Sequence, residues 1–354
     1  MNKNKTRELL ISHYKTYPEL QAEDIFKYIF QSSFGCEHLV SNEGLVLENI
    51  KKEYDALQKT KTPIKELLDG SYSRVHLSCL NEGLNAETLA KLFCLSAKKE
   101  PDGMAELEEK ISVVKNLIAD KSLPLDRDSF DLSLNKWESK GYPAIRHSDV
   151  FRSAYNPAYR VIDNRYADYL QIFIKIDALL SKGSAVVAID GGSASGKTTL
   201  SGILQSVYDC NVFHMDDFFL RPEQRTAQRL AEVGGNVDRE RFYDEVLLPL
   251  RQNKTVCYRK IDCSTQTLGQ PITVTPKKLT IIEGAYSMHP KFEKYYDLSL
   301  FLDIDPIYQK ERILKRNTKQ LAKRFFEEWI PLENIYFSQT QIKSRCSESI
   351  IIKQ

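Results

Sequence analysis

Residues 185–199 read Ala-Val-Val-Ala-Ile-Asp-Gly-Gly-Ser-Ala-Ser-Gly-Lys-Thr-Thr, and this stretch decides the fold of the second half of the chain. The apolar run 185–189 predicts a buried strand, and residues 191–198 fit the pattern Gly-x-x-x-x-Gly-Lys-Ser/Thr. Apolar residues at helical spacing follow over 200–207. A strand, a glycine-rich loop and a helix in this order predict a loop that cradles phosphate groups.

This loop carries the groups that a nucleoside triphosphate needs. Glycines let backbone N–H groups point at phosphate oxygens, and the helix N-terminus adds partial positive charge. Lys197 is expected to reach the β- and γ-phosphates, and the hydroxyl of Thr198 is expected to bind Mg²⁺. We therefore expect ATP and Mg²⁺ as cofactors. The expected nucleotide-binding residues are Gly191, Gly192, Ser193, Ala194, Ser195, Gly196, Lys197, Thr198 and Thr199.

From Gly183 onward, short apolar runs alternate with helical stretches, which predicts an α/β fold with a mainly parallel sheet flanked by helices. Ligands of such sheets bind at the carboxyl ends of the strands. The residues directly after each run are therefore candidates for the site. The predicted strands cover residues 185–189, 211–215, 279–282, 298–302 and 350–352.

Carboxylates follow several of these runs: Asp216 comes after the second run and Glu283 after the third. Phosphoryl transfer needs one carboxylate to hold Mg²⁺ or its waters, and another to orient or deprotonate the attacking hydroxyl group. We expect Asp216 to be the base, and Glu283 to bind the metal together with Thr198.

A basic helix is predicted from Pro306 to Arg316. A basic, mobile segment after the last helix is what a lid needs in order to close over phosphates and neutralise charge in the transition state. Arg312 and Arg316 are four residues apart and share one face. We expect these two arginines to be catalytic, together with Lys197 and Asp216, although a solvated cationic face is the alternative interpretation.

Residues 183–354 resemble the uridine kinase and phosphoribulokinase branch of the P-loop kinases. Five elements carry the resemblance in the family's order. Residues 191–199 are similar to the family's Gly-Gly-Ser-Gly-Ser-Gly-Lys-Thr-Thr loop, 215–219 to its Asp-x-Phe-Tyr element, 236–244 to its Asn-Phe-Asp stretch, 281–284 to its Val-Glu-Gly element, and 302–305 with Arg312 and Arg316 to its Asp-x-Asp with downstream arginines.

The resemblance implies the roles given above for the two strand-end acids, and it implies that Asp238 contacts the sugar of a nucleoside. Phe219 and Tyr258 are the other substrate-binding residues that it suggests. Phe219 replaces a tyrosine of the family, and Val237 replaces an aromatic residue that would stack on a base. A site without its polar partners for a base selects that base weakly, so kinase chemistry is better supported than specificity for uridine.

We therefore expect a uridine kinase-like phosphotransferase that acts on a hydroxyl group of a nucleoside or a related sugar-bearing compound. One alternative is a kinase for a sugar phosphate or a pantothenate-like alcohol, with Arg259 and Lys260 near the acceptor. Another is a nucleotide-gated regulator whose N-terminal domain binds a macromolecular partner. No Asn-Lys-x-Asp segment that would read guanine follows the loop, which disfavours a GTPase switch.

Residues 1–160 differ in pattern and predict a mainly helical domain without an assigned role, joined by a helix over 161–182 to a kinase domain at 183–354. Polar clusters lie at 36–38, 73–76 and 146–160. They permit three interpretations: a metal site, a satisfied interdomain surface, or an anion site. The anion site would use Arg74, Arg146, Arg152 and Arg160. The predicted helices cover residues 22–30, 87–99, 104–120 and 128–139.

The composition disfavours several classes of protein. Fifty Lys and Arg residues against 48 Asp and Glu give a net charge of +2, so no strong field points to nucleic acid or to a membrane. Seven scattered cysteines without a Cys-x-x-Cys pair suit a reducing cytoplasm. No apolar stretch is long enough for a bilayer, and no signal-peptide core is visible. We expect a cytoplasmic protein with a small-molecule acceptor, and its oligomeric state stays open.

Overall fold

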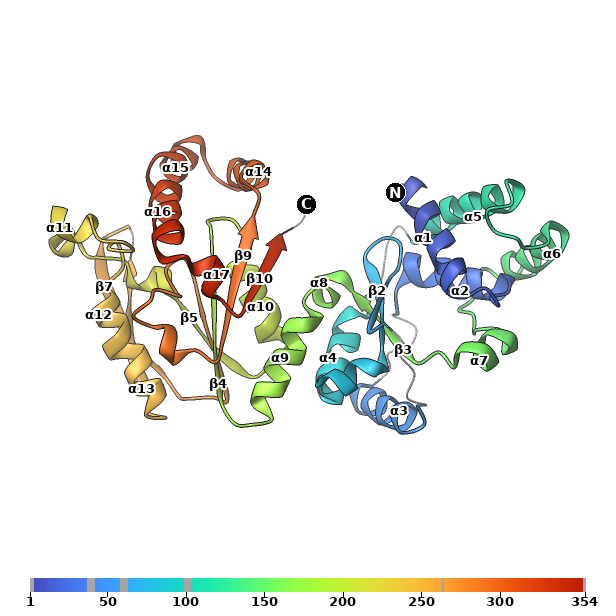
Figure 1. The fold of residues 1–354 in the computed structure, drawn as a ribbon, viewed down its shortest axis with the longest axis horizontal. Helices are drawn as coiled ribbons and strands as arrows, with labels where there is room; N and C mark the ends of the chain where they lie inside the picture. Colours follow the sequence, from blue (N-terminus) through green and yellow to red (C-terminus); the bar gives the residue numbers. More distant parts are fainter. Residues whose placement is uncertain (1–2, 37–41, 58–62, 99–102, 263, 353–354) are drawn as a thin grey trace. The chain divides into compact units, whose positions relative to one another are not determined.

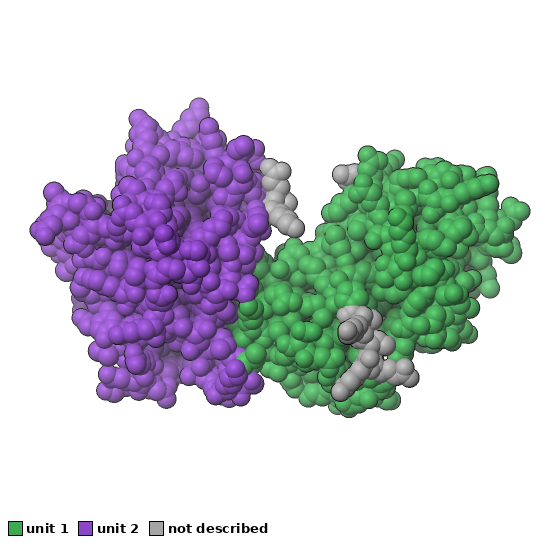
Figure 2. All heavy atoms as spheres, in the orientation of Figure 1, with its two compact units in different colours: residues 1–178 green, residues 179–354 purple. Residues whose placement is uncertain are grey.

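The computed structural model describes residues 3–36, 42–57, 63–98, 103–262 and 264–352. The chain divides into two compact units, residues 1–178 and residues 179–354 (Figure 2). The division falls within helix α9 (Leu170–Leu180), close to the start of the predicted kinase domain.

Unit 1, residues 1–178, is mainly helical, and its described residues also form a three-stranded antiparallel sheet in the order β1-β2-β3 (Figure 1). Its helices form where apolar residues recur every three or four positions; Val114 and Leu117 of α5, for example, are fully buried. The strands are β1 (Lys65–Leu67), β2 (Tyr72–His76) and β3 (Tyr159–Asp163). The helices are α1 (Lys3–Thr16), α2 (Ala22–Phe34), α3 (Glu43–Asp55), α4 (Ala86–Ser96), α5 (Gly103–Ala119), α6 (Arg127–Glu138), α7 (Asp149–Tyr155), α8 (Asn164–Ala167) and α9.

The predicted connecting helix over residues 161–182 is wrong as a single helix. Its first residues belong to β3, which pairs with β2. The side chain of Asp163 then accepts a hydrogen bond from the backbone N–H of Arg165, which ends the strand and caps α8. Helical periodicity applies from Leu170 onward, in α9.

Unit 2, residues 179–354, contains a five-stranded sheet in the order β10-β9-β4-β8-β5, and every neighbouring pair runs parallel. The predicted α/β fold is thus confirmed. The predicted strand 211–215 ends one residue early, because Met215 begins the short 3₁₀ helix η3 (Met215–Phe218). The strands are β4 (Ala185–Gly191), β5 (Cys210–His214), β8 (Leu279–Glu283), β9 (Leu298–Ile304) and β10 (Glu348–Ile352).

A separate antiparallel hairpin, β6 (Val256–Asp262) and β7 (Thr267–Val274), was not predicted. Burial alternates along β6, with Val256 and Tyr258 inside and Cys257 and Arg259 outside. A half-exposed strand of this kind has no continuous apolar run, so a search for buried parallel strands misses it.

Helices cover the sheet of unit 2 and extend beyond its carboxyl edge (Figure 1). Helix α10 (Lys197–Val207) packs against β4, β5 and β8. Beyond the carboxyl end of β9 come α14 (Pro306–Arg316), α15 (Lys319–Arg324) and α16 (Ile330–Thr340), which we name the C-terminal helices. The remaining helices are α11 (Ala227–Leu230), α12 (Arg239–Phe242), α13 (Leu248–Arg251) and α17 (Ile342–Arg345).

Candidate active site

The phosphate-loop pattern joins the end of β4 to the start of α10, as predicted. Gly191 has a φ of 143°, and a Cβ atom added there would lie 2.4 Å from the carbonyl oxygen of Leu302 on neighbouring β9, so only glycine fits. Gly196, at φ 102°, caps the N-terminus of α10, and Ala194 takes a left-handed φ of 62°. This sharp turn at a helix N-terminus is the geometry that favours phosphate binding.

Lys197 and Thr198 are the first two residues of α10. The ammonium group of Lys197 donates hydrogen bonds to the carbonyl oxygens of Gly191 and Gly192, at 2.8 and 3.0 Å. The hydroxyl group of Thr198 donates to Oε1 of Glu283, at 3.1 Å. The ammonium group of Lys197 therefore lies at the loop. The hydroxyl of Thr198 and the carboxylate of Glu283 lie beside each other at the same end of α10.

The register of the sheet brings the predicted acids to this loop. Glu283 ends β8, directly opposite Ile189 of β4 and His214 of β5. Asp216 follows His214 by two residues, within η3. Nδ1 of His214 lies 2.5 Å from Oε1 of Glu283. Asp216, Glu283 and the loop thus share one edge of the sheet, the edge where ligands of parallel sheets bind.

Charged groups at this edge of the sheet influence the pKa values of Asp216 and His214. The side chain of Asp216 keeps contact with solvent, but the surrounding protein removes part of its hydration and raises the pKa of its carboxyl group. The charge of Lys197 opposes this rise, and repulsion by Glu283 adds to it. The hydrogen bond that His214 donates to Glu283 raises the pKa of His214. A carboxylate with an increased proton affinity is better able to accept a proton from a hydroxyl group.

Asp190 is a buried acid that the sequence interpretation missed, although it directly precedes the loop. Its carboxylate is fully buried and accepts hydrogen bonds from the backbone N–H of Gly191 at 2.7 Å, the N–H of Met288 at 3.0 Å and the hydroxyl of Tyr336 at 2.8 Å. Burial raises the pKa of Asp190 to about 6 despite these donors. Asp190 therefore joins β4 and the start of the loop to α16.

Glu333 of α16 is a second acid at the loop, and nothing in the local sequence marks it. Its carboxylate accepts hydrogen bonds from the backbone N–H of Ser193 at 2.8 Å and from the hydroxyl of Ser193 at 2.6 Å. Burial raises the pKa of Glu333, while the charge of Lys197 lowers it. The carboxylate of Glu333 thus occupies the backbone N–H of Ser193. Without it, this N–H would be free to bind an oxygen of an anion such as a phosphate.

Helix α14 also contacts the loop. The guanidinium group of Arg312 donates to the carbonyl oxygen of Ala194 at 3.1 Å, and Gln309 donates to that of Ser193 at 2.8 Å. The side chain of Ala194 packs in an apolar cluster with Ile313 of α14 and Ala322 of α15. The structure thus places Arg312 at the loop, whereas Arg316, one turn further along α14, is exposed.

Asp238, the expected sugar contact, has partners within the chain. Oδ1 accepts the backbone N–H of Arg241 at 3.1 Å, which caps α12, and Oδ2 accepts the side-chain amide of Gln224 at 2.7 Å. The residue is 4% exposed. This environment gives Asp238 a structural role, and its contact with a substrate stays a prediction.

The two expected aromatic residues of the acceptor site lie in different environments. Phe219 follows η3, is half-buried, and forms an isolated β-bridge with Val237. Tyr258 lies in the core, where its ring stacks on Phe218 at 5.6 Å. Tyr258 therefore packs as a core residue, and its role in substrate binding stays a prediction.

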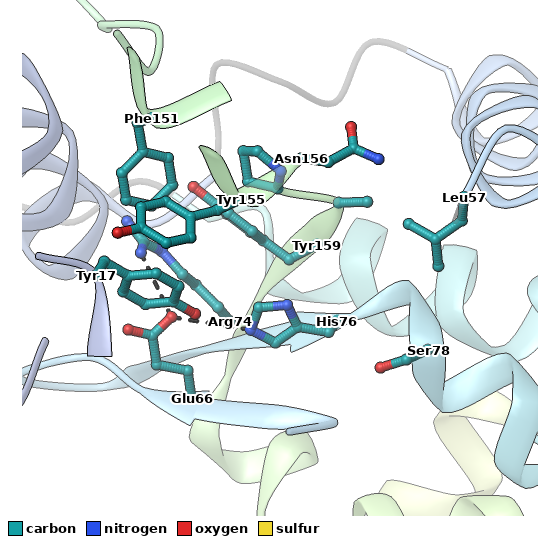
Figure 3. A pocket seen from close by; sticks show the side chains of 12 residues that line it. Tyr17, Leu57, Glu66, Arg74, His76, Ser78, Phe151, Tyr155, Asn156 and Tyr159 are labelled. Carbon is teal, nitrogen blue, oxygen red and sulfur yellow. Dashed lines mark hydrogen bonds and ion pairs between the residues drawn. The ribbon is translucent and has the colours of Figure 1, made fainter. Parts of the chain in front are cut away.

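The polar clusters of unit 1 do not form the four-arginine anion site. Arg160 forms a two-fold ion pair with Glu53, Arg152 pairs with Asp149, and Arg146 is exposed. Among these four arginines only Arg74 lines the pocket drawn in Figure 3. Glu37 and His38 of the first cluster lie outside the described residues. Within the described ranges, no group of three or more His, Cys, Asp or Glu side chains could hold a metal ion.

Sequence similarity to known uridine kinases supports a kinase. The chain is 26% identical over 150 residues to the uridine kinase of Staphylococcus aureus strain JH9, which covers 40% of this chain and 72% of that protein. The uridine kinase of strain Newman matches to the same extent. A solved structure described as a possible uridine kinase from Bacillus stearothermophilus is 20% identical, with a TM-score of 0.37, covering 51% of this chain and 99% of the other. No protein-family model matches the chain.

Part of the chain is therefore a uridine kinase-like P-loop kinase, and its chemistry is phosphoryl transfer of the kinase type. In the described part of the chain, no helix has the length and apolar character needed to cross a lipid bilayer.

Proposed function

We propose that the chain is an ATP- and Mg²⁺-dependent kinase that phosphorylates a hydroxyl group of a small molecule, namely a nucleoside or a related sugar-bearing compound. The observation that carries this proposal is the grouping of Lys197, Thr198, Glu283 and Asp216 at the carboxyl edge of the sheet, beside the phosphate loop. The similarity to uridine kinases supports a nucleoside as the class of acceptor.

The residues present fit a magnesium ion. Mg²⁺ prefers oxygen ligands and is usually held by one or two carboxylates together with substrate phosphates and water. The hydroxyl of Thr198 and the carboxylate of Glu283 are two such oxygens, 3.1 Å apart. When bound, the ion would neutralise negative charge on the phosphates. These two residues would hold it, and His214 would orient Glu283 through its hydrogen bond.

The roles of the other residues follow from their positions. Lys197 and the backbone N–H groups of the loop would bind phosphate oxygens and stabilise the charge that develops on them. Asp216 would accept the proton of the acceptor hydroxyl or orient this hydroxyl for in-line attack. Arg312 already contacts the loop, and Arg316 would reach the phosphates when the C-terminal helices close over them.

The test is an acceptor screen with two variants. The chain is incubated with ATP, Mg²⁺ and a panel of nucleosides, sugars, sugar phosphates and pantothenate, and phosphorylated products are identified by mass spectrometry. Asp216→Asn should lower turnover of the accepted compound by about 10² or more and leave the Kd for ATP unchanged, because it removes the base only. Lys197→Ala should weaken ATP binding and turnover together.

Asp217→Asn is the matched control, because Asp217 is the adjacent acid and forms an ion pair with Lys260 at 3.1 Å. This variant should retain most of the turnover. Equal losses in Asp216→Asn and Asp217→Asn, or unchanged turnover in Asp216→Asn, would remove the base assignment. ATP binding without phosphorylation of any compound in the panel would contradict the proposed kinase activity.

A further inference from the structure

Unit 1 contains a pocket with a volume of about 300 Å³, at the lower end of the range for small-molecule sites. Three helices and one strand supply its lining: Lys27 comes from α2, Val46 from α3, Phe93 from α4 and Val161 from β3. We name it the Lys27 pocket. It is half open to solvent, so a small molecule can enter it without a rearrangement of the fold.

The ammonium group of Lys27 has no carboxylate partner among the described residues. It donates a hydrogen bond to the carbonyl oxygen of Ile145 at 3.0 Å. An ammonium group has three N–H donors, so donors remain for a ligand. Burial lowers the pKa of Lys27 to about 8; the charges of Arg74 and Arg146 add to this fall, and that of Asp24 opposes it. An anion beside Lys27 would therefore stabilise its charged form.

The other ionisable groups of the pocket have partners. Both carboxylate oxygens of Glu53 accept hydrogen bonds from the guanidinium group of Arg160, at 2.9 and 2.8 Å. Both ring nitrogens of His147 form hydrogen bonds, and burial lowers its pKa to about 4, so the ring is neutral at pH 7. The Lys27 pocket therefore has a positive charge that a ligand with one negative charge would balance.

Strand β3 adds a backbone donor on its outer side. The N–H of Leu77 donates to the carbonyl oxygen of Ala158, and the N–H of Asn164 donates to that of Ser71. Because hydrogen-bonded pairs alternate along an antiparallel ladder, the even-numbered residues of β3 pair with β2. The backbone N–H and C=O of Val161 therefore face away from β2.

Helix α4 lies along this outer side of β3. The hydroxyl oxygen of Ser96 accepts the N–H of Asp163 at 2.9 Å, and Phe93, one turn earlier on α4, lines the Lys27 pocket together with Val161. The buried side chain of Val46 lines it from α3. The pocket thus combines an ammonium group, an outward backbone N–H and apolar side chains.

We propose that the Lys27 pocket binds a small organic acid that has one carboxylate and an apolar body. The carboxylate would accept hydrogen bonds from Lys27 and from the N–H of Val161, and the apolar body would contact Val46 and Phe93. A carboxylate carries a single charge, which one ammonium group balances, whereas a phosphate group carries about −1.5 to −2 at pH 7. This site is distinct from the kinase site of unit 2, and the inference does not depend on the proposed function.

The experiment titrates benzoate and 4-methylpentanoate into the full chain at pH 7 by calorimetry, with benzamide as the uncharged counterpart of benzoate. We expect at least one of the acids to bind, benzamide to bind at least tenfold more weakly than benzoate, and hydrogen–deuterium exchange to show protection of peptides that contain residues 159–163. Lys27→Met should weaken acid binding tenfold or more. Lys52→Met, which alters an exposed lysine of α3 outside the pocket, should leave it unchanged.

A change of pH tests the same charge without a substitution, because Lys27 loses its proton as pH rises through about 8. The affinity of the unaltered chain for the acid should fall about tenfold between pH 7 and pH 9. This measurement decides the matter if Lys27→Met loses the circular dichroism spectrum of the folded chain.

Four outcomes would overturn the inference: neither acid binds; benzamide binds as tightly as benzoate; folded Lys27→Met binds the acid as tightly as the unaltered chain; or the affinity for the acid is the same at pH 7 and pH 9.

Discussion

Replacing Gly191 by alanine tests the geometry of the phosphate loop most directly. The added Cβ would lie 2.4 Å from the carbonyl oxygen of Leu302, and ordinary contacts begin near 3.4 Å, so the backbone must shift by roughly 1 Å. That shift is resisted because Leu302 is the strand partner of Gly191 in the sheet. The φ of 143° adds strain for any residue with a side chain.

The expected cost combines both effects. Backbone strain of this kind costs about 1–3 kcal/mol, and overpacking costs a further 1–3 kcal/mol. We therefore expect Gly191→Ala to lower the free energy of unfolding of unit 2 by roughly 2–6 kcal/mol. A shift of about 1 Å in the loop should also reduce turnover by about 10². Urea denaturation, ATP titration calorimetry and the kinase assay measure the three effects.

Gly202→Ala is the matched control. Gly202 lies in the middle of α10, and among the described residues an added Cβ there meets no atom within 4 Å apart from the backbone of its own helix. Alanine favours the helix over glycine by about 0.5–1 kcal/mol, so this variant should gain that stability and keep its activity. If Gly191→Ala matches Gly202→Ala in stability and turnover, the loop does not have the tight packing against β9 on which this reasoning rests.

Two further predictions concern the buried acids. Glu333→Gln should tighten ATP binding by about tenfold, because it removes a negative charge beside the phosphate loop while an amide can still pair with Ser193; calorimetry showing weaker binding would refute this. The pKa of Asp190 rises on folding from 3.8 to about 6, so the folded state binds the proton more tightly, and stability falls as pH rises from about 4 to about 6. The shift corresponds to about 3 kcal/mol. Asp190→Asn should abolish this part of the pH dependence in urea denaturation curves of unit 2, and curves with identical slopes for both proteins would contradict it.

The sequence predicts where the loop and the two strand-end acids of unit 2 lie, because there the signal is local. The loop 191–198 is read from contiguous residues, and Asp216 and Glu283 are found because each directly follows an apolar run. Parallel strands end at the same edge, so their order along the chain suffices to bring the acids together. The resulting grouping at Glu283 is observed in the hydrogen bonds from Thr198 and His214.

The sequence interpretation missed contacts between residues that lie far apart along the chain. Glu333 lies 140 residues beyond Ser193, and Tyr336 lies 146 residues beyond Asp190, so no local periodicity links either pair. The strands of unit 1 were missed for a different reason. Residues 72–76 are all buried, yet three of them are polar, and their burial depends on ion pairs and hydrogen bonds rather than on an apolar run.

The hydrogen bonds between the phosphate loop and the C-terminal helices suggest a way to inhibit the protein. Three side chains of these helices form hydrogen bonds with the backbone of residues 193–194: Gln309, Arg312 and Glu333. The hydroxyl of Tyr336 donates a hydrogen bond to Asp190, in the strand that leads into the loop. A movement of α14 or α16 would therefore also displace residues 193–194 of the loop. A compound that binds between α16 and the loop would change the shape of the phosphate-binding loop. Such an inhibitor would act without occupying the ATP site, so it would not compete with ATP.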